Sequence, residues 1–208
     1  MRLTNSEIRA KAREVLGGKI FDKSWLMALL ACLVVDIIVS SASGITFGIG
    51  AIILAGPLYL GINKLFLNAV RTSEEIKVEK VFDGFKTFKE SLVLSIMESI
   101  FIFLWSLLFI IPGIIKAYSY SMSLYILADH PEYTWKQCLD ESRKMMKGHK
   151  WSLFCLQFSF IGWIIVSIFT LGVGLLWVTP YEQAATAAFY NELKAANEPE
   201  AEAAEANA

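Results

Sequence analysis

Four ionisable residues stand within long apolar stretches of the chain, where a charge is costly. They are Asp36, Glu98, Lys116 and Glu182. In a membrane such residues usually face the interior of a helix bundle, and they often mark ion or proton routes. Because three of the four are acids, a path lined by them would favour protons or cations. Two interpretations stay open, a hydrated path and a set of interhelical hydrogen bonds that hold a bundle together.

Further polar residues follow these four at helical spacing, so each is expected to extend a polar stripe on one helix face. The stripes pair Asp36 with Ser40, Glu98 with Ser95, Lys116 with Ser119, and Glu182 with Thr186. Asp36 and Lys116 are expected to form an ion pair if their helices touch. Pro180 is a candidate hinge because proline removes a helical N–H.

The sequence offers little for catalysis. The two histidines, His130 and His149, lie at opposite ends of one polar loop, and no HExxH, GxSxG or P-loop spacing occurs. "ADHPEY" at 128–133 is interpreted as a membrane-exit turn rather than a metal site. Cys32, Cys138 and Cys155 are scattered and predict no disulfide or metal framework. No catalytic, cofactor-binding or metal site is therefore predicted, and a net charge of −1 argues against nucleic-acid binding.

The elements that carry these residues are expected to be membrane helices. Hydrophobic residues make up 55% of the 208 residues, and a hydrocarbon core needs about 20 apolar residues per helical crossing. We predict an all-α, polytopic membrane protein with six transmembrane helices in three hairpins. The helices span about 24–41, 47–68, 91–111, 113–129, 151–171 and 174–191. The turns are placed at Ser40–Gly44, at Pro112 and Gly113, and at Thr170–Gly174.

Each hairpin is preceded by a predicted amphipathic helix that lies in the membrane interface. These helices cover about 5–17, 75–89 and 134–147, and a Thr4-x-x-Glu7 capping box begins the first. Their basic residues either attract anionic lipid headgroups or form a plain structural collar. Together the helices form one integral membrane domain over 1–196, and the acidic, alanine-rich tail at 197–208 is expected to be disordered.

The basic residues set the expected orientation. Of the 19 lysines and arginines, all but Lys116 lie on one side of the predicted segments, so both termini are expected to be cytoplasmic. Lys116 is expected on the other side. The short fourth segment, 113–129, leaves a re-entrant alternative open.

Several motifs in matching order resemble one known family. They are "NSEIRAKAREVL", "AGPLYLG", "VFDGF", "LWSLLFIIPGIIKAYSYSM", "SRKMMKGHK", "SFIGW" and "TPYEQA". The chain resembles, over nearly its whole length, the bacterial integral-membrane family catalogued as domain of unknown function 975. That resemblance implies a bacterial cytoplasmic membrane protein and supplies no substrate.

The function expected from the sequence is that of a non-enzymatic structural, lipid-associated or partner-binding membrane component. Its expected partners are membrane lipids, chiefly anionic headgroups at the cytoplasmic face, with a protein partner or a second copy of the chain left open. The alternative is a small-solute or proton/cation transporter that uses the intramembrane carboxylates. Loss of flux in Glu182→Gln and Glu98→Gln would separate the two.

Overall fold

The computed structural model describes residues 4–17, 22–45, 49–72, 76–169, 172 and 174–205. All regular secondary structure in these ranges is helical, so the all-α class is confirmed. The elements are α1 (Asn5–Val15), α2 (Lys23–Ile45), α3 (Ile49–Thr72), η1 (Val78–Thr87), α4 (Phe88–Leu108), α5 (Ile110–Tyr120), α6 (Ser123–Asp129), α7 (Trp135–Met145), α8 (Lys150–Phe169) and α9 (Leu175–Glu205).

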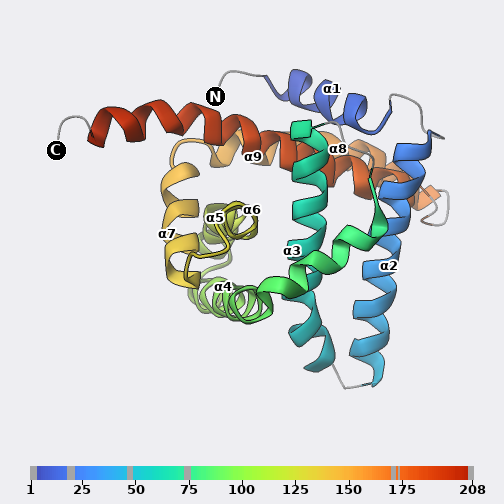
Figure 1. Ribbon diagram of the computed structural model, residues 1–208, viewed down its shortest axis with the longest axis horizontal. Helices are drawn as coiled ribbons and strands as arrows, with labels where there is room; N and C mark the ends of the chain where they lie inside the picture. The colour runs from blue at the N-terminus through green and yellow to red at the C-terminus, as the bar shows by residue number, and fades with distance from the viewer. Residues whose placement is uncertain are drawn as a thin grey trace.

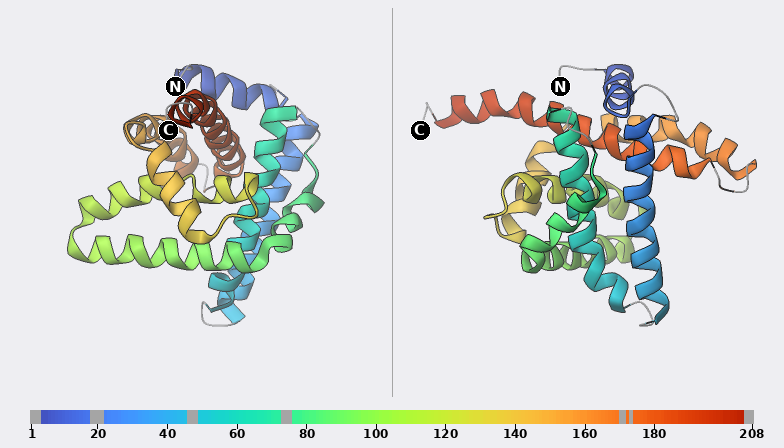
Figure 2. Two further views of the ribbon diagram at one scale, coloured as in Figure 1. Left: turned by 60° about the vertical axis from the view of Figure 1, so that its left-hand side comes forward. Right: turned by 45° about the vertical axis from the view of Figure 1, so that its right-hand side comes forward.

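Successive long helices pack in pairs, α2 with α3, α4 with α5, and α8 with α9. The pairs leave a common base in different directions. In Figure 1 the first pair points down, the last points right, and the middle pair is seen end-on. The middle pair extends to the left after the rotation in Figure 2 (left). The helix pairs are therefore splayed and do not form a parallel bundle.

Among the residues that the structure describes, five helical stretches are long and apolar enough to cross a membrane. They are Lys23–Gly44, Gly50–Thr72, Val78–Leu107, Ile110–Asp129 and Lys150–Ser167. The sixth predicted segment, 174–191, is not among them, because it lies within α9 and that helix carries more charged and polar residues.

Helix α3 is the central element, with α2, η1, α4, α6 and α9 packed around it. Its contact with η1 depends on glycine, because a Cβ on Gly61 would overlap the Val81 carbonyl oxygen. A Cβ on Gly84 would in turn overlap the Pro57 carbonyl oxygen. The backbones of α3 and η1 therefore meet without side chains between them.

The second predicted interfacial helix is the 3₁₀ helix η1, which has three residues per turn. That period places Val81 and Gly84 together on the buried face toward α3. It also aligns the rings of Phe82, Phe85 and Phe88, which follow one another at centroid distances of 6.3 and 6.1 Å. The period of three residues per turn therefore gives η1 one face that packs against α3 and one face of aromatic rings.

The middle pair differs from the sequence prediction in two places. The break between α4 and α5 is at the extended residue Phe109, and Pro112 lies inside the first turn of α5, where its missing N–H costs nothing. Gly113 lets the two helices approach closely, since a Cβ there would overlap Ser106 Oγ. The predicted segment 113–129 is also interrupted by a turn at 121–122, so it forms the two short helices α5 and α6.

The ends of other elements also need correction. Helix α2 continues through the predicted turn at Ser40–Gly44 to Ile45. Helix α9 continues from its apolar region into the tail predicted to be disordered, because alanine and glutamate favour helix. It ends at Glu205. Of the predicted turn at 170–174, residues 170, 171 and 173 lie outside the described ranges, and Gly172 has a φ of +85°.

The first and third of the helices predicted to be interfacial, α1 and α7, begin with capping boxes. The Thr4 hydroxyl accepts from the Glu7 amide and the Glu7 carboxylate accepts from the Thr4 amide, which confirms the predicted box. The hydrogen bonds from Thr4 lower the pKa of the Glu7 carboxyl. Thr134 and Gln137 form an equivalent box at the start of α7.

Candidate functional site

The most strongly paired charge in the described chain is Asp129, at the end of α6. Its Oδ1 accepts from Arg71 Nη1 at 2.6 Å and its Oδ2 accepts from Arg71 Nη2 at 2.8 Å. Lys194 Nζ and Tyr190 Oη donate to the same Oδ2 at 2.8 and 3.0 Å. The Asp129 side chain is only 7% exposed. We call Asp129, Arg71, Lys194 and Tyr190 the Asp129 cluster.

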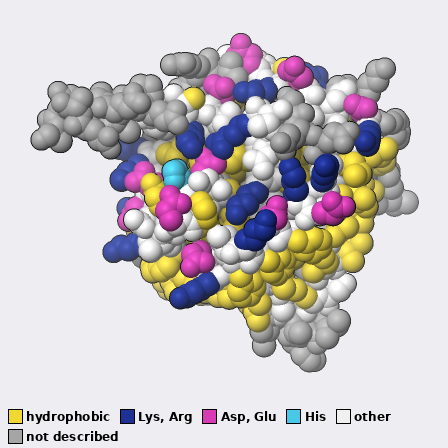
Figure 3. Space-filling view, in the orientation of Figure 1, with side chains coloured by type: hydrophobic (Ala, Val, Ile, Leu, Met, Phe, Trp, Pro, Cys, Tyr) yellow, Lys and Arg dark blue, Asp and Glu magenta, His cyan; other side chains and the backbone are white. Residues whose placement is uncertain are grey.

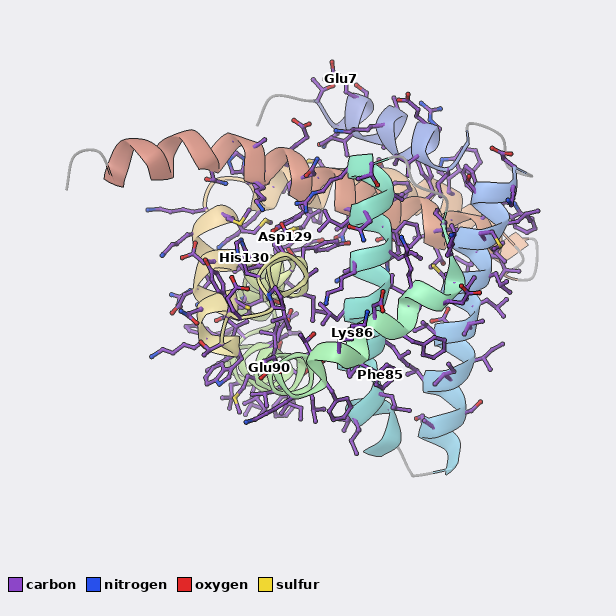
Figure 4. The ribbon with its side chains drawn as sticks, in the orientation of Figure 1. Glu7, Phe85, Lys86, Glu90, Asp129 and His130 are labelled. Carbon is purple, nitrogen blue, oxygen red and sulfur yellow. The ribbon has the colours of Figure 1, made fainter. Side chains whose placement is uncertain are left out.

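Three elements supply the Asp129 cluster, and it ties them together. Arg71 comes from the last turn of α3, Asp129 ends α6, and Tyr190 and Lys194 lie on α9. Figure 4 shows Asp129 near the middle of the molecule, where α6 lies beside α3 and α9. Tyr125 of α6 stacks on Tyr190 at a centroid distance of 5.3 Å. The cluster therefore ties the short helix α6 to α3 of the first pair and to α9 of the last pair.

The sequence interpretation missed this cluster, because it treated Asp129 only as part of "ADHPEY". The remaining residues of that motif form a local turn, in which His130 Nδ1 lies 3.1 Å from Glu132 and the imidazole stacks on Tyr133 at 4.6 Å. The sequence signal that could have revealed the cluster is the position of its charged residues at the ends of apolar helices. Arg71 and Asp129 each stand in the last turn of an apolar helix, and Lys194 follows the apolar part of another. Charges at such ends meet when the helices share one membrane face.

Lys116 lies in a pocket of about 520 Å³ that is lined mainly by cations from α5, α7 and the start of α8. The lining residues are Lys116, Ser119, Asp140, Arg143, Lys144, Lys147 and Lys150. We call this the Lys116 pocket. The expectation that Lys116 stands apart from the other basic residues is therefore wrong, because α7 folds back along α5 and brings its cations to it.

Part of the charge in the Lys116 pocket is already neutralised. Arg143 Nη1 lies 3.1 Å from Asp140, and Lys144 Nζ lies 2.7 Å from Glu141. Lys116, Lys147 and Lys150 have no acidic partner among the described residues. Lys116 Nζ instead lies 4.6 Å from the centre of the Trp105 ring, a cation–π contact. The pocket keeps a surplus of positive charge.

An exposed apolar tip lies at the turn between α4 and α5, about 10 Å along α5 from Lys116. Leu107 is 73% exposed, Phe109 70% and Ile110 74%. Such exposure is unusual for large apolar side chains and is typical of a surface that meets a membrane or a partner protein. Figure 3 shows a similar separation over the visible face, with charged side chains in the upper and left parts and an apolar band along the lower right.

Glu98 and Glu182 lie on either side of the short helix α6. The Glu98 carboxylate accepts from Ser123 Oγ at 2.7 Å, and Ser123 is 1% exposed. Glu182 lies within electrostatic reach of Tyr118 and of Tyr125, whose hydroxyl is buried without a hydrogen-bond partner. The Glu98 and Glu182 carboxylates therefore lie on different sides of α6.

Asp36 lies away from Lys116, so the structure does not bring the two together as an ion pair. Asp36 faces an open pocket of about 350 Å³ between α2 and α9, which it shares with Cys32, Ser40 and Thr179. The pocket therefore places the predicted Asp36 and Ser40 stripe of α2 beside Thr179 of α9. Pro180, the candidate hinge, is buried, and α9 runs through it as a continuous helix.

The arrangement defines a class, an all-α protein whose long apolar helices could span a membrane and whose charged residues gather at one common base. The chain belongs to the family described as "Protein of unknown function (DUF975)", whose family model matches residues 1–119 and 107–197. No curated protein and no solved structure matches the chain.

Proposed function

We propose that this protein is a non-enzymatic, lipid-associated structural component of a membrane, which holds anionic phospholipid headgroups at its charged base. The observation that carries the proposal is the Lys116 pocket together with the exposed tip of α4 and α5. A surplus of cations near an apolar surface matches the two parts of an anionic lipid. The location that we propose is the bacterial cytoplasmic membrane, as the family resemblance implies.

The topology that we propose has six membrane-embedded helices in three pairs, with both termini on the cytoplasmic side. Five of the helices are supported by their length and composition, and the first turns of α9 supply the sixth. Basic residues at the base of the pairs favour that side.

The middle pair enters the membrane without crossing it in this proposal. Lys116 lies seven residues after the turn at Phe109, or about 10 Å along the helix at 1.5 Å per residue. The hydrocarbon core is about 30 Å thick. If Lys116 and the cations of α7 stay at the headgroups, the tip reaches only into the nearer leaflet.

The lipid preference can be measured with spin-labelled phospholipids in bilayers that contain the reconstituted full chain. Phosphatidylglycerol should associate more strongly than phosphatidylcholine, and the double variant Lys147→Gln, Lys150→Gln should reduce this preference about fivefold per lysine. High salt should weaken it as well, because exposed charges are screened. Equal association of the two lipids with the wild type would contradict the proposal.

A further inference from the structure

A second pocket, whose lining residues differ from those of the Lys116 pocket, lies beneath α1. It has a volume of about 540 Å³, within the range of ligand sites, and is formed by α1, α2, α8 and α9. Its walls include Arg9, Arg13, Trp25, Trp163, Trp177 and Tyr181. We call it the α1 pocket.

Two buried donors of the α1 pocket have no partner. Arg9 Nε and Trp25 Nε1 are both buried and make no hydrogen bond within the part of the chain that the structure describes, and Trp25 is only 6% exposed. Neither Arg9 nor Arg13 forms an ion pair with an acid in the described ranges. Buried donors in native proteins are nearly always satisfied. The missing partner must be an acceptor, and two guanidinium groups favour an anion, above all a phosphate.

The helix that covers the pocket is fixed at several points. Asn5 Nδ2 donates to the Ser152 carbonyl oxygen at 3.2 Å, and Lys11 Nζ lies 3.5 Å from Glu192. Tyr181 Oη donates to the Arg9 carbonyl oxygen at 3.3 Å. Figure 2 (right) shows α1 lying over α8 and α9. The arginines are thus held over the pocket before any ligand arrives.

The remaining residues that line the α1 pocket are mainly aromatic and suit the apolar portion of a ligand. Trp25 and Tyr181 lie with ring centroids 5.9 Å apart, and Trp163 on α8 is 61% exposed. The apolar surface continues from Trp163 to Val166, which lies one helical turn further along α8 and is 56% exposed. A ligand anchored at the arginines can therefore extend along this surface without meeting a charge of α8.

We infer that the α1 pocket binds one anionic glycerophospholipid, with its phosphate at Arg9, Arg13 and Trp25 and an acyl chain along α8. This inference rests on the proposed lipid association and deepens it, because it assigns one discrete site with one lipid per chain. The same phosphate chemistry could come from a soluble phosphate ester, so the test separates the two sources.

The experiment counts lipids bound to the full chain in detergent by native mass spectrometry. The probes are dioleoylphosphatidylglycerol, dioleoylphosphatidylcholine and sn-glycerol 3-phosphate. The wild type should retain one phosphatidylglycerol per chain and bind the other two probes at least about tenfold more weakly. Arg9→Gln and Trp25→Phe should each weaken phosphatidylglycerol binding by about tenfold, since each removes one donor to a charged group. Trp25→Phe keeps an aromatic ring, and thermal unfolding checks that both variants fold.

The double variant Lys147→Gln, Lys150→Gln is the matched control, because it removes cations from the Lys116 pocket alone. It should leave the tightly bound lipid in place while lowering the preference measured with spin-labelled lipids. Unchanged phosphatidylglycerol binding in both Arg9→Gln and Trp25→Phe would overturn the inference, and so would equally tight binding of glycerol 3-phosphate. After either result, the spin-label measurement still tests the general lipid association independently.

Discussion

At the residue scale, Asp129 is the side chain that links α6 to both α3 and α9. It forms ion pairs with both Arg71 and Lys194 and accepts from the Tyr190 hydroxyl. Removal of a buried carboxylate from such a network leaves the charge of its cations uncompensated, which usually costs more than the pair itself contributes. The side chains of Arg71 and Lys194 are 29% and 30% exposed, so water compensates part of that loss.

We therefore expect Asp129→Asn to lower the free energy of unfolding by about 1–3 kcal/mol. Thermal unfolding of the purified protein in detergent measures the change. Asp140→Asn is the control, because its pair with Arg143 is exposed on one helix and should contribute less than about 0.5 kcal/mol. Equal effects of the two substitutions would show that the Asp129 cluster does not hold the base together.

The intramembrane carboxylates give a second prediction at this scale. A structural role for Glu98 and Glu182 requires that liposomes containing the wild type show no proton or monovalent-cation flux above empty liposomes. Flux in the wild type that disappears in Glu182→Gln, with folding intact, would instead establish the transporter alternative. We expect the first outcome, because Glu98 accepts from Ser123 and Asp36 lies in a separate pocket with Cys32.

The sequence identified the costly residues but not their partners. Apolar surroundings single out Asp36, Glu98, Lys116 and Glu182 in any reading of the chain. Their partners depend on how the helix pairs cross, and no local pattern encodes a crossing. Asp129 also shows that sequence patterns do not identify distant partners. Its neighbours in sequence form a turn, while its hydrogen-bond partners come from α3 and α9.

At the element scale, glycine contacts decide where helices can approach. Gly84→Ala should destabilise the protein by about 1–3 kcal/mol, because the new methyl group would press η1 away from the Pro57 carbonyl of α3. Gly162→Ala on α8 is the matched control, since nothing lies within 4 Å of its added Cβ. That substitution should be neutral or stabilising by up to about 1 kcal/mol. Chemical denaturation in detergent compares them, and equal changes would contradict the close contact.

The depth of the middle pair can be tested with single cysteines in a background without Cys32, Cys138 and Cys155. A cysteine at Phe109 should be protected from a membrane-impermeant maleimide on both sides, because the tip ends within the bilayer. A cysteine at Gly44, at the end of α2, should react from the non-cytoplasmic side. Labelling of the Phe109 position from that side would show that the middle pair crosses.

Native Cys138 gives a separate labelling prediction for the wild-type chain. It is 0% exposed on α7, and burial raises the pKa of its thiol to about 12. The thiolate is the reactive form, so Cys138 should stay unlabelled at neutral pH until the protein unfolds. Rapid modification of folded protein at Cys138 would contradict the packing of α7 against α6.

Element ends were less predictable than element types. Periodicity and capping residues predicted α1 and its box correctly. Proline and glycine suggested a turn at 112–113, but the chain turns at Phe109 because Gly113 is needed for the approach of α5 to Ser106. The same residue types serve turns and close helix contacts, and only the fold distinguishes them.

At the scale of the whole molecule, the splay of the helix pairs separates an apolar periphery from a charged base (Figures 1 and 3). Helix α3 of the first pair and α9 of the last pair meet α6 at the Asp129 cluster, while the tip between α4 and α5 is exposed. Amino-acid composition predicted the membrane, and hydropathy predicted the long helices. The splay follows from contacts between distant segments, such as α1 on α9 and η1 on α3, which sequence patterns do not report.

The central claim is that all three helix pairs enter the membrane from one side. The most direct test is to measure on which side of the membrane the residues at the ends of the pairs lie. Single cysteines at Glu79, His130 and Glu192 should all react with an impermeant maleimide in inverted vesicles and none in right-side-out vesicles. Each of these positions precedes or follows a complete pair, so each lies on the side of the termini in the proposed topology. Labelling of any one of them only in right-side-out vesicles would mean that a pair contains an odd number of crossings, and it would contradict the account.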